Sequence, residues 1–500
     1  MSLPAIFILA QGEFLYMESF LSRIRKAASE SFIHHHLNYF LPTIYTIADW
    51  IMILLAERLA YAIRVWLLGN HDFHIAWMNA YIAFPLFFIL FLRQGQIYQK
   101  QMSWWKLMER IFYGCTYAIS SIVVLVYATH IAASTSRLFI GLLWPLSFGF
   151  IVLSRYMINH LLAWAGVGKI PFLLVGGGKT ARLLIDGIKK DVGLSYHVVG
   201  YVDDAGPQEI VGEREYLGTF SDIESVIRQT QVKDVMIAAP GLSPEKLDQL
   251  LHKVTPLVRN VFFIPDLIGL PLNGVEVEPL FHEQLLLMGL RNNLARRYNR
   301  IIKRIFDLTL TIIGGTLLLP VFAFIAIIIK LDSPGPVFFA HERIGKNGQL
   351  FPCFKFRTMC ENADVQLRTY LRQNPEARKE WNAEFKLKND PRITRVGKVL
   401  RRTSLDELPQ IWNVVRGEMS LVGPRPIVRE EISKYGNYIN DFYSVHPGIT
   451  GMWQVNGRSD TTYEQRVQMD SWYVRNWSVW LDIMLLWKTF GAVTARKGAY

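Results

Sequence analysis

Four long apolar stretches in the first third of this 500-residue chain constrain its fold more than any other feature. They lie near residues 39–66, 76–94, 109–131 and 138–163. A helix of about 20 apolar residues is long enough to cross a bilayer. The chain is therefore predicted to be a multidomain, multi-pass membrane protein. An N-terminal segment over 1–36 would precede a four-helix transmembrane bundle over 37–165.

The charges of the connectors predict the orientation of this bundle. Arg93, Lys100, Lys106 and Arg110 make the second connector basic, and basic connectors stay on the cytoplasmic side. The first and third connectors are short and nearly uncharged, so we expect them to be external. Both ends of the bundle, and the segment over 1–36, would then face the cytoplasm.

Charged side chains interrupt the first apolar stretch at Asp49, Glu57, Arg58 and Arg64. Intramembrane charges are one sign of a functional site. The alternative is pairing, because Glu57 can meet another helix and Arg64 can extend to the interface. We favour pairing.

Residues 166–282 carry the pattern of a small Rossmann-like α/β domain. An apolar run over 169–175 leads into three glycines and a helical stretch, and further β-type runs follow near 198–202, 234–239 and 261–264. Asp203 and Asp204 lie near the distance expected for a ribose contact. No catalytic Tyr-x-x-x-Lys accompanies them. The domain either binds a dinucleotide or is a regulatory or dimerising module, and we favour the second interpretation.

A net charge of +12 indicates anionic partners. Beside apolar spans, a membrane surface and phosphorylated substrates fit this charge better than nucleic acid does. Residues 283–304 are predicted to form a basic linker helix at the anionic cytoplasmic surface. Residues 305–330 are apolar, with basic residues on both sides and Pro320 in the middle. We expect this segment to enter the membrane, bend and return to the same face; the alternative is a fifth spanning helix.

Two adjacent carboxylates, Asp406 and Glu407, follow a basic run. Pro409 is best tolerated in the first turn of a helix, so a helix is expected to begin near Asp406, with Ser404 as its cap. The helix N-terminus and nearby arginines would lower the pKa of both carboxyls and attract phosphate. An ionised Asp406 in that setting suits nucleophilic attack on phosphorus. The alternative is a capped surface helix.

Further blocks surround this pair at 354–359, 389–394, 417–426 and 447–458. Together and in this order, the five blocks resemble the bacterial sugar transferases called monotopic phosphoglycosyl transferases. The resemblance covers about residues 300–500. The preceding region is similar to the long-chain members, which start O-antigen, lipopolysaccharide, capsule or exopolysaccharide synthesis. Segments 351–357 and 385–390 are most similar to the undecaprenyl-phosphate galactose phosphotransferases.

The resemblance implies an α+β catalytic domain over 331–500, with interfacial C-terminal helices, on the cytoplasmic side of the bacterial inner membrane. It implies transfer of a sugar 1-phosphate from a UDP-sugar to undecaprenyl phosphate, with release of UMP. Asp406 would be the nucleophile, and Asp406 and Glu407 would hold Mg²⁺. A homodimer embedded in inner-membrane lipids is also expected. Contacts to the diphosphate and uridine would come from five cations, which are Lys355, Arg357, Arg401, Arg425 and Arg458.

The donor sugar and two rival functions stay open at this point. Galactose is expected, with glucose as the alternative. A sugar-nucleotide oxidoreductase or dehydratase would use the 166–282 domain, and a non-enzymatic scaffold would release no UMP. The three cysteines form no disulfide framework and no metal-ligand spacing.

Overall fold

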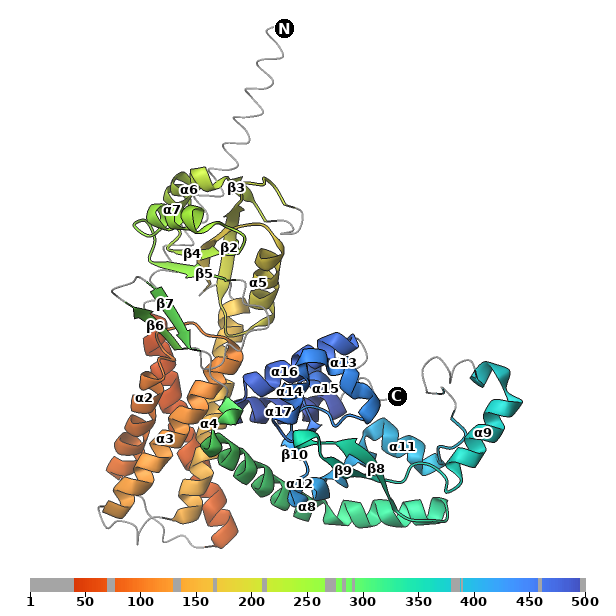
Figure 1. Cartoon of the computed structure of the whole chain (residues 1–500). Coiled ribbons are helices and arrows are strands. Elements are labelled where there is room, and N and C mark those ends of the chain that lie inside the picture. Colours follow the sequence, from red (N-terminus) through yellow and green to blue (C-terminus); the bar gives the residue numbers. More distant parts are fainter. Residues whose placement is uncertain are drawn as a thin grey trace, which may run out of the picture. The chain divides into compact units, whose positions relative to one another are not determined.

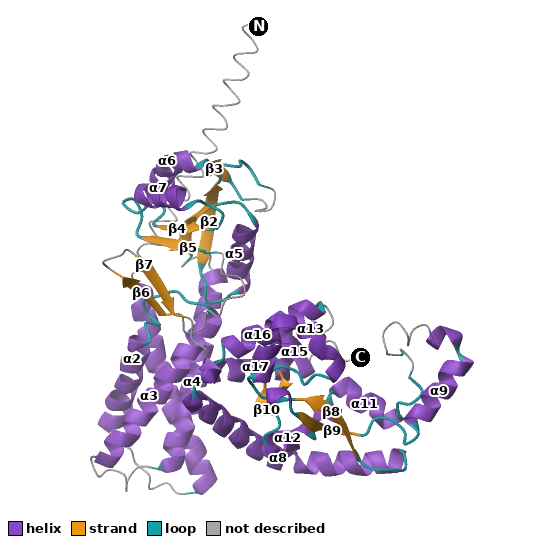
Figure 2. Cartoon of the chain, viewed as in Figure 1, coloured by secondary structure: helices purple, strands orange, loops and turns teal. Residues whose placement is uncertain are grey.

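The computed structural model describes residues 40–69, 77–128, 136–164, 169–208, 214–265, 276–280, 285–289, 293–378, 387, 390–456 and 461–494. The chain divides into two compact units, Met1–Asp266 and Leu267–Tyr500 (Figure 1, Figure 2). Each unit contains its own hydrophobic cores.

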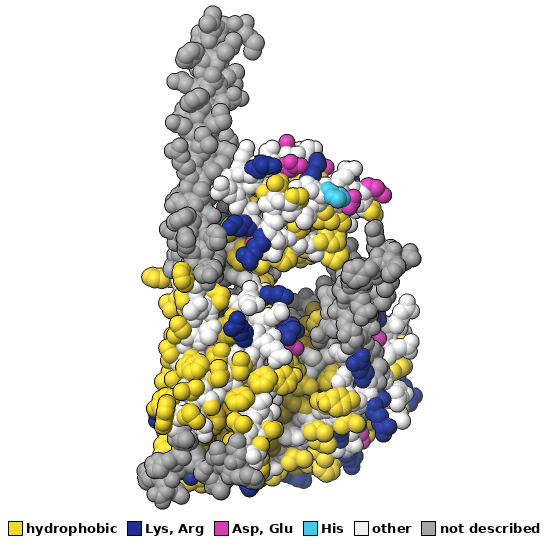
Figure 3. All heavy atoms as spheres, turned by 90° about the vertical axis from the view of Figure 1, so that its left-hand side faces the viewer, with side chains coloured by type: hydrophobic (Ala, Val, Ile, Leu, Met, Phe, Trp, Pro, Cys, Tyr) yellow, Lys and Arg dark blue, Asp and Glu magenta, His cyan; other side chains and the backbone are white. Residues whose placement is uncertain are grey.

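Helices open the first unit where the sequence predicts apolar spans. They cover 40–68, η1 (Asn79–Ala83, a π-helical turn) running into α2 (Phe84–Gln94), α3 (Trp104–Ala128) and α4 (Arg137–Trp164). Hydrophobic side chains face outward over much of this part in Figure 3. By length and composition, α3 and α4 could cross a membrane, and Asn79–Gln94 is a shorter apolar helix.

One charge of the first helix, Asp49, is paired inside the bundle. Nη2 of Arg155, in α4, donates to Oδ2 of Asp49 over 2.7 Å, and the hydroxyl of Tyr98 donates to the same oxygen over 2.9 Å. Removal of one partner from such a buried pair leaves an uncompensated charge. The ion pair therefore connects the helix over 40–68 to α4.

The α/β part of this unit is a parallel sheet with the strand order β3-β2-β1-β4-β5, which confirms the Rossmann-like prediction. Its strands are β1 (Ile170–Val175), β2 (Tyr196–Val202), β3 (Tyr216–Gly218), β4 (Asp234–Ile237) and β5 (Asn260–Phe263). Its helices are α5 (Lys179–Lys190), η4 (Phe220–Asp222), α6 (Ile223–Thr230) and α7 (Pro244–Val254). Of the five strands of this sheet, β3 alone was not predicted, because its three residues are too few to show a recognisable pattern.

The glycine turn after β1 binds a carboxylate of the protein itself. The N–H of Gly177 donates to Oδ2 of Asp203 over 2.6 Å, and a Cβ on Gly177 would lie 2.9 Å from the side chain of Gln208. Oδ1 of Asp204 accepts the N–H of Phe220 over 2.9 Å. Both acids expected at a ribose thus accept hydrogen bonds from the domain's own backbone.

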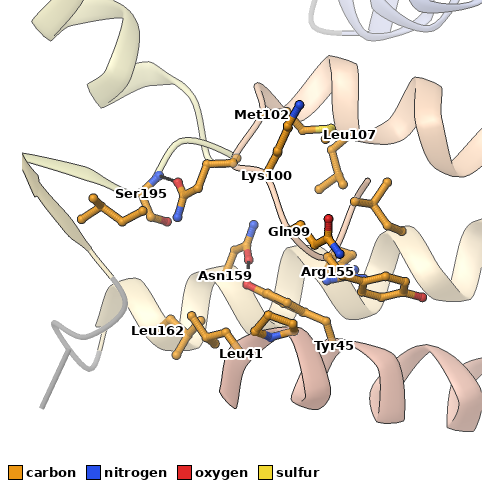
Figure 4. A pocket seen from close by; sticks show the side chains of 16 residues that line it. Leu41, Tyr45, Gln99, Lys100, Met102, Leu107, Arg155, Asn159, Leu162 and Ser195 are labelled. Atoms are coloured by element: carbon orange, nitrogen blue, oxygen red, sulfur yellow. Dashed lines mark hydrogen bonds between the residues drawn. The ribbon is translucent and has the colours of Figure 1, made fainter. Parts of the chain in front are cut away.

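The helical and α/β parts of the first unit meet at a polar pocket (Figure 4). The hydroxyl of Tyr45 donates to Asn159 over 2.7 Å, and the N–H of Ser195 donates to Gln101 over 2.8 Å. A Cβ on Gly193 would lie 2.6 Å from backbone atoms of the connector that precedes α3. Any side chain at this position would push the two parts away from each other.

The second unit begins with a hairpin that the sequence analysis did not anticipate. Strands β6 (Glu276–Leu280) and β7 (Leu285–Gly289) pair with each other and not with the parallel sheet. The predicted boundary at 282 and the helical linker over 283–304 are therefore wrong. The apolar run of β7 pairs as a strand, a short turn η5 (Asn293–Ala295) follows, and the helix begins only at Arg297.

Helix α8 (Arg297–Asp332) unites the end of the predicted linker with the predicted membrane segment. Pro320 lies inside it, and Figure 1 shows the helix bent along its length. Both ends pack on the same domain. Arg304 donates to Val414 O over 2.7 Å, and Asp332 accepts the N–H of Val396 over 3.2 Å. α8 is also long and apolar enough to cross a membrane.

The rest of the second unit is an α+β domain in which helices surround two small sheets (Figure 2). β8 (Phe338–Ile344) pairs antiparallel with β9 (Leu350–Phe356) across η6 (Lys346–Gly348), and β10 (Ser420–Val422) pairs parallel with β11 (Gly448–Thr450). The remaining elements are α9 (Ala363–Gln373), α11 (Arg395–Thr403), η7 (Leu405–Glu407), α12 (Gln410–Arg416), η8 (Arg429–Glu431), α13 (Ile432–Tyr435), η9 (Gly436–Tyr438), α14 (Ile439–Tyr443), α15 (Met452–Asn456), α16 (Tyr463–Arg475) and α17 (Val479–Thr494).

Aromatic residues of the C-terminal helices are divided between the core and the surface. Tyr473 and Trp477 are only 1% and 2% exposed. Both donate hydrogen bonds to the buried carboxylate of Asp482, over 2.7 and 3.0 Å respectively. Asp482 also accepts from Lys303 of α8 over 2.7 Å. The C-terminal helices are expected to be interfacial, and these two rings do not fit that expectation because they are buried within the domain. Trp487, farther along α17, is 71% exposed.

Candidate functional site

Asp406 and Glu407 lie on the short turn η7, between α11 and α12. Ser404 ends α11 in the left-handed conformation, with φ of +56°, and its side chain makes no capping hydrogen bond. Regular helix resumes only at Gln410, directly after Pro409. The predicted start near Asp406 therefore holds only for a 3-10 turn, and the predicted side-chain cap by Ser404 is wrong, because the left-handed residue turns the chain before the acidic pair.

The two neighbouring carboxyls have opposite pKa shifts. Asp406 is 9% exposed, and burial raises its pKa despite the opposing charges of Lys355 and Arg401. Burial acts in the same direction on Glu407, but Lys355 and then Arg425 outweigh it and hold the pKa of Glu407 below its usual range. The predicted lowering is thus right for Glu407 and wrong for Asp406, whose desolvation dominates.

Lys355, on β9, is the cation that both carboxylates share. Its Nζ donates to Oε1 of Glu407 over 2.7 Å and lies 3.9 Å from Oδ2 of Asp406. All three side chains are at least partly shielded from water, where such interactions are stronger than at the surface. The Lys355 ammonium therefore offsets the repulsion between the two adjacent carboxylates.

A buried amide fixes β9 against α12 and so sets the distance between Lys355 and the acidic turn. Nδ2 of Asn413 donates to Pro352 O over 2.7 Å, and its Oδ1 accepts the N–H of Phe354 over 3.1 Å. Nδ2 also donates to Glu418 over 2.6 Å. Sequence reasoning missed Asn413, because its partners lie about 60 residues away along the chain.

Arg401 lies on the Asp406 side of the site. Its Nε donates to the hydroxyl of Thr358 over 2.9 Å, and its charge acts on the pKa of Asp406. Arg402 is exposed, whereas Arg401 is half-buried. Of these two adjacent arginines, the structure thus places Arg401 toward the site.

Arg425 lies on the Glu407 side, in a pocket that it shares with Lys355, Glu407 and Arg343. Its guanidinium carbon lies 5.9 Å from the centre of the Trp453 ring. Further lining comes from Cys353, Gln410, Pro426, Gly448, Ile449 and Gln454.

Backbone packing fixes the loop that carries Arg425. A Cβ on Gly448 or Gly451 would overlap the backbone of Gly423, two residues before Arg425. The N–H of Gly423 donates to Thr450 O over 2.8 Å, and the N–H of Gly448 donates to Pro424 O over 2.8 Å. Only glycine allows this approach, so the loop rests directly on neighbouring main chain.

Arg343 was missed as a site residue, although strand alternation could have revealed it. It lies opposite Phe351 in the β8–β9 register, and Phe351, Cys353 and Lys355 alternate along one face of β9. The glycine-containing turn over 345–348 between two apolar runs is the signal of a hairpin.

Arg357, another of the predicted cations, does not join this group. Arg357 donates to Ser333 O over 2.7 Å and to Pro334 O over 2.6 Å, so it closes the C-terminal end of α8. The prediction that Arg357 contacts substrate is not supported by this position. Arg458 lies outside the described residues.

The acidic pair is a partial fit for Mg²⁺. Mg²⁺ favours carboxylate oxygens and usually takes its other ligands from phosphates and water. Asp406 and Glu407 offer such oxygens, one of which already bonds Lys355. Among the described residues, no group of three or more His, Cys, Asp or Glu side chains could hold a metal. The pair therefore fits the ion when a bound diphosphate completes the ligand set.

Two protein-family models match the chain. The model described as "Bacterial sugar transferase" matches residues 298–496, which include the whole acidic site. The model described as "CoA-binding domain" matches residues 95–265, which include the parallel sheet.

Curated relatives extend this similarity over most of the chain. A UDP-galactose-lipid carrier transferase of Erwinia amylovora is 38% identical over 412 residues, covering 81% of this chain and 84% of its own. An undecaprenyl-phosphate galactose phosphotransferase of Salmonella typhimurium is 38% identical, over 71% and 75% of the two chains. A UDP-glucose:undecaprenyl-phosphate glucose-1-phosphate transferase of Escherichia coli is 32% identical, over 67% and 70%.

Proposed function

Because this chain belongs to the bacterial sugar transferases, we propose that it transfers a hexose 1-phosphate from a UDP-sugar to undecaprenyl phosphate and releases UMP. The observation that carries the proposal is a buried Asp406 beside Glu407, with Lys355 within 4 Å of both carboxylates. The transfer would be the first membrane step in the synthesis of an O-antigen, capsule or exopolysaccharide.

Asp406 is the nucleophile in this proposal. One carboxylate oxygen attacks the sugar-bearing phosphorus, and the bond from that phosphorus to the oxygen of UMP breaks, with the electron pair leaving on UMP. An oxygen of undecaprenyl phosphate then attacks the same phosphorus and regenerates the carboxylate. Both steps need neutralisation of phosphate charge more than acid–base chemistry. Lys355, Arg401 and Arg425 converge on the acidic pair and can supply it.

Mg²⁺ is the cofactor that suits this site, with Asp406 and Glu407 as its protein ligands. When bound, it would neutralise negative charge on the diphosphate. Glu407 favours that role, because its lowered pKa keeps it ionised.

Galactose is the proposed sugar, with glucose as the alternative. Two relatives at 38% identity are named for galactose, and a relative at 32% is named for glucose.

The site is assigned to the cytoplasmic face of the inner membrane, with α8 entering the membrane and returning. Both ends of α8 contact one domain, through Arg304 and Asp332. Between them, apolar side chains such as Leu317 and Phe324 are exposed. A helix held at both ends by one domain is difficult to reconcile with a straight crossing of a bilayer about 30 Å thick.

A panel of UDP-sugars tests the reaction and the donor together. We expect UMP release with UDP-galactose in the presence of Mg²⁺, and none in excess chelator. Without lipid acceptor, the phosphosugar should remain on Asp406 and be located by mass spectrometry. Asp406→Asn should abolish both adduct and turnover. An adduct on another residue would contradict the assignment of the nucleophile.

A further inference from the structure

Two arginines of the site, Arg343 and Arg425, make no direct ion pair within the described part of the chain. Both are half-buried and line the same pocket as Glu407. In the part of the chain that the structure describes, neither guanidinium has a hydrogen bond or an ion pair with a carboxylate. Burial, and next the like charge of Arg425, lower the pKa of Arg343. Two unpaired cations held together in a shielded pocket favour binding of an anion.

The backbone holds the two arginine-bearing segments together. The N–H of Ile344 donates to Ile427 O over 2.8 Å, as an antiparallel bridge. Arg343 directly precedes one residue of this bridge, and Arg425 lies two residues before the other. This bridge therefore holds the two segments that carry the arginines beside each other.

Arg343 and Arg425 line the same pocket as Glu407, whereas Arg401 is not among the residues that line it. Arg343 and Arg425 act on the pKa of Glu407, whereas Arg401 acts on that of Asp406. Arg401 is bound to Thr358, outside the pocket that Arg343 and Arg425 line. If Asp406 attacks the sugar-bearing phosphorus, the phosphate on the opposite side of the breaking bond belongs to the nucleotide.

We propose that Arg343, together with Arg425, binds the phosphate of the leaving nucleotide, so that Arg343 serves only the first of the two transfer steps. The inference rests on the proposed function. In the first step, the carboxylate oxygen of Asp406 bonds to the sugar-bearing phosphorus as the phosphorus–oxygen bond to UMP breaks. Two planar guanidinium groups match the oxygens of the departing phosphate, which gains negative charge. In the second step UMP has left, and Arg343 has no ligand.

The test separates the two steps in full-length protein held in nanodiscs, with UDP-galactose as the donor probe. The first step is followed as a UMP burst without lipid, and the second as decay of the preformed adduct after addition of undecaprenyl phosphate. The variants are Arg343→Gln and Arg343→Lys. Arg429→Gln is the matched control, because Arg429 is an exposed arginine four residues beyond Arg425.

Arg343→Gln should slow the UMP burst and weaken inhibition by added UMP, each by about tenfold or more. The rate of adduct decay should stay at the wild-type value, as should all three measurements in the control. Arg343→Lys should recover part of the loss, because it keeps the charge without the planar fork. It also serves as the test variant if Arg343→Gln folds poorly.

Equal slowing of both steps, or unchanged inhibition by UMP, would overturn the assignment of Arg343. Failure of the proposed function has a different signature, since wild-type protein would then give neither a UMP burst nor an adduct.

Discussion

Lys355 controls the ionisation of both carboxyls of the site. Its ammonium lowers the pKa of Glu407 and opposes the rise that burial imposes on Asp406. Asp406 must be ionised to attack phosphorus, so activity should decline as the pH falls through its raised pKa.

Replacement of Lys355 by methionine should move this acid limb to higher pH. The substitution removes the positive charge that favours both ionised carboxyls, so each of them takes up its proton at a higher pH. The measurement is kcat/KM for UMP release against pH, compared with wild type. Arg416→Met serves as the control, because Arg416 is exposed at the end of α12. An acid limb that stays in place, or moves to lower pH, would contradict the electrostatic role of Lys355.

At the scale of elements, the joint between β9 and α12 determines the geometry of the site. Asn413→Ala removes the amide and leaves Pro352 O and the N–H of Phe354 without their partners. We expect a loss of roughly 2–4 kcal/mol in the free energy of unfolding. Transfer activity should fall as well, because Lys355 is no longer held against Glu407. Thermal unfolding in detergent and UMP release measure the two effects.

Glu418→Gln is the matched control for this joint. It alters the third bond of the Asn413 amide and the 3.9 Å ion pair of Glu418 with Arg416, and it leaves both bonds to β9 intact. An Asn413→Ala variant as stable and as active as this control would show that the joint does not position the site.

The contrast between Asp406 and Asn413 shows what sequence alone could predict. Asp406, Glu407 and Arg425 lie within short blocks, and the strands around the glycine turn have a clear apolar pattern. Arg343 could have been found from the alternation of the β8–β9 hairpin, whereas Asn413 reaches the site through packing between distant segments, which local patterns do not encode. The prediction that Arg357 contacts substrate is unsupported for a similar reason, because the sequence around Arg357 does not reveal that the end of α8 lies beside it.

On the scale of the whole molecule, the topology of α8 is open to direct measurement. Single cysteines at Arg297 and Gln349 flank the membrane segment, and both positions are exposed. They are introduced in a background without the native Cys115, Cys353 and Cys360. A thiol reagent confined to the outside of intact cells should label neither position. Labelling at Gln349 alone would establish a spanning helix.

A cysteine at His71, in the connector predicted to be external, is the positive control for the same reagent. Its labelling demonstrates that the reagent reaches the outer face of the protein. Permeabilised cells should then label both flanks of α8.

The contact of Gly448 and Gly451 with the backbone of Gly423 has a consequence for redesign of donor choice. At these glycines backbone packs directly on backbone, so there is no room for a side chain. A single substitution there cannot change the shape of the loop that carries Arg425 without displacing neighbouring backbone. Libraries aimed at a new sugar should therefore hold these glycines constant and vary the side chains that line the cleft, such as Gln410 and Gln454. In such a library the backbone of the site would stay fixed while the side chains that line it change.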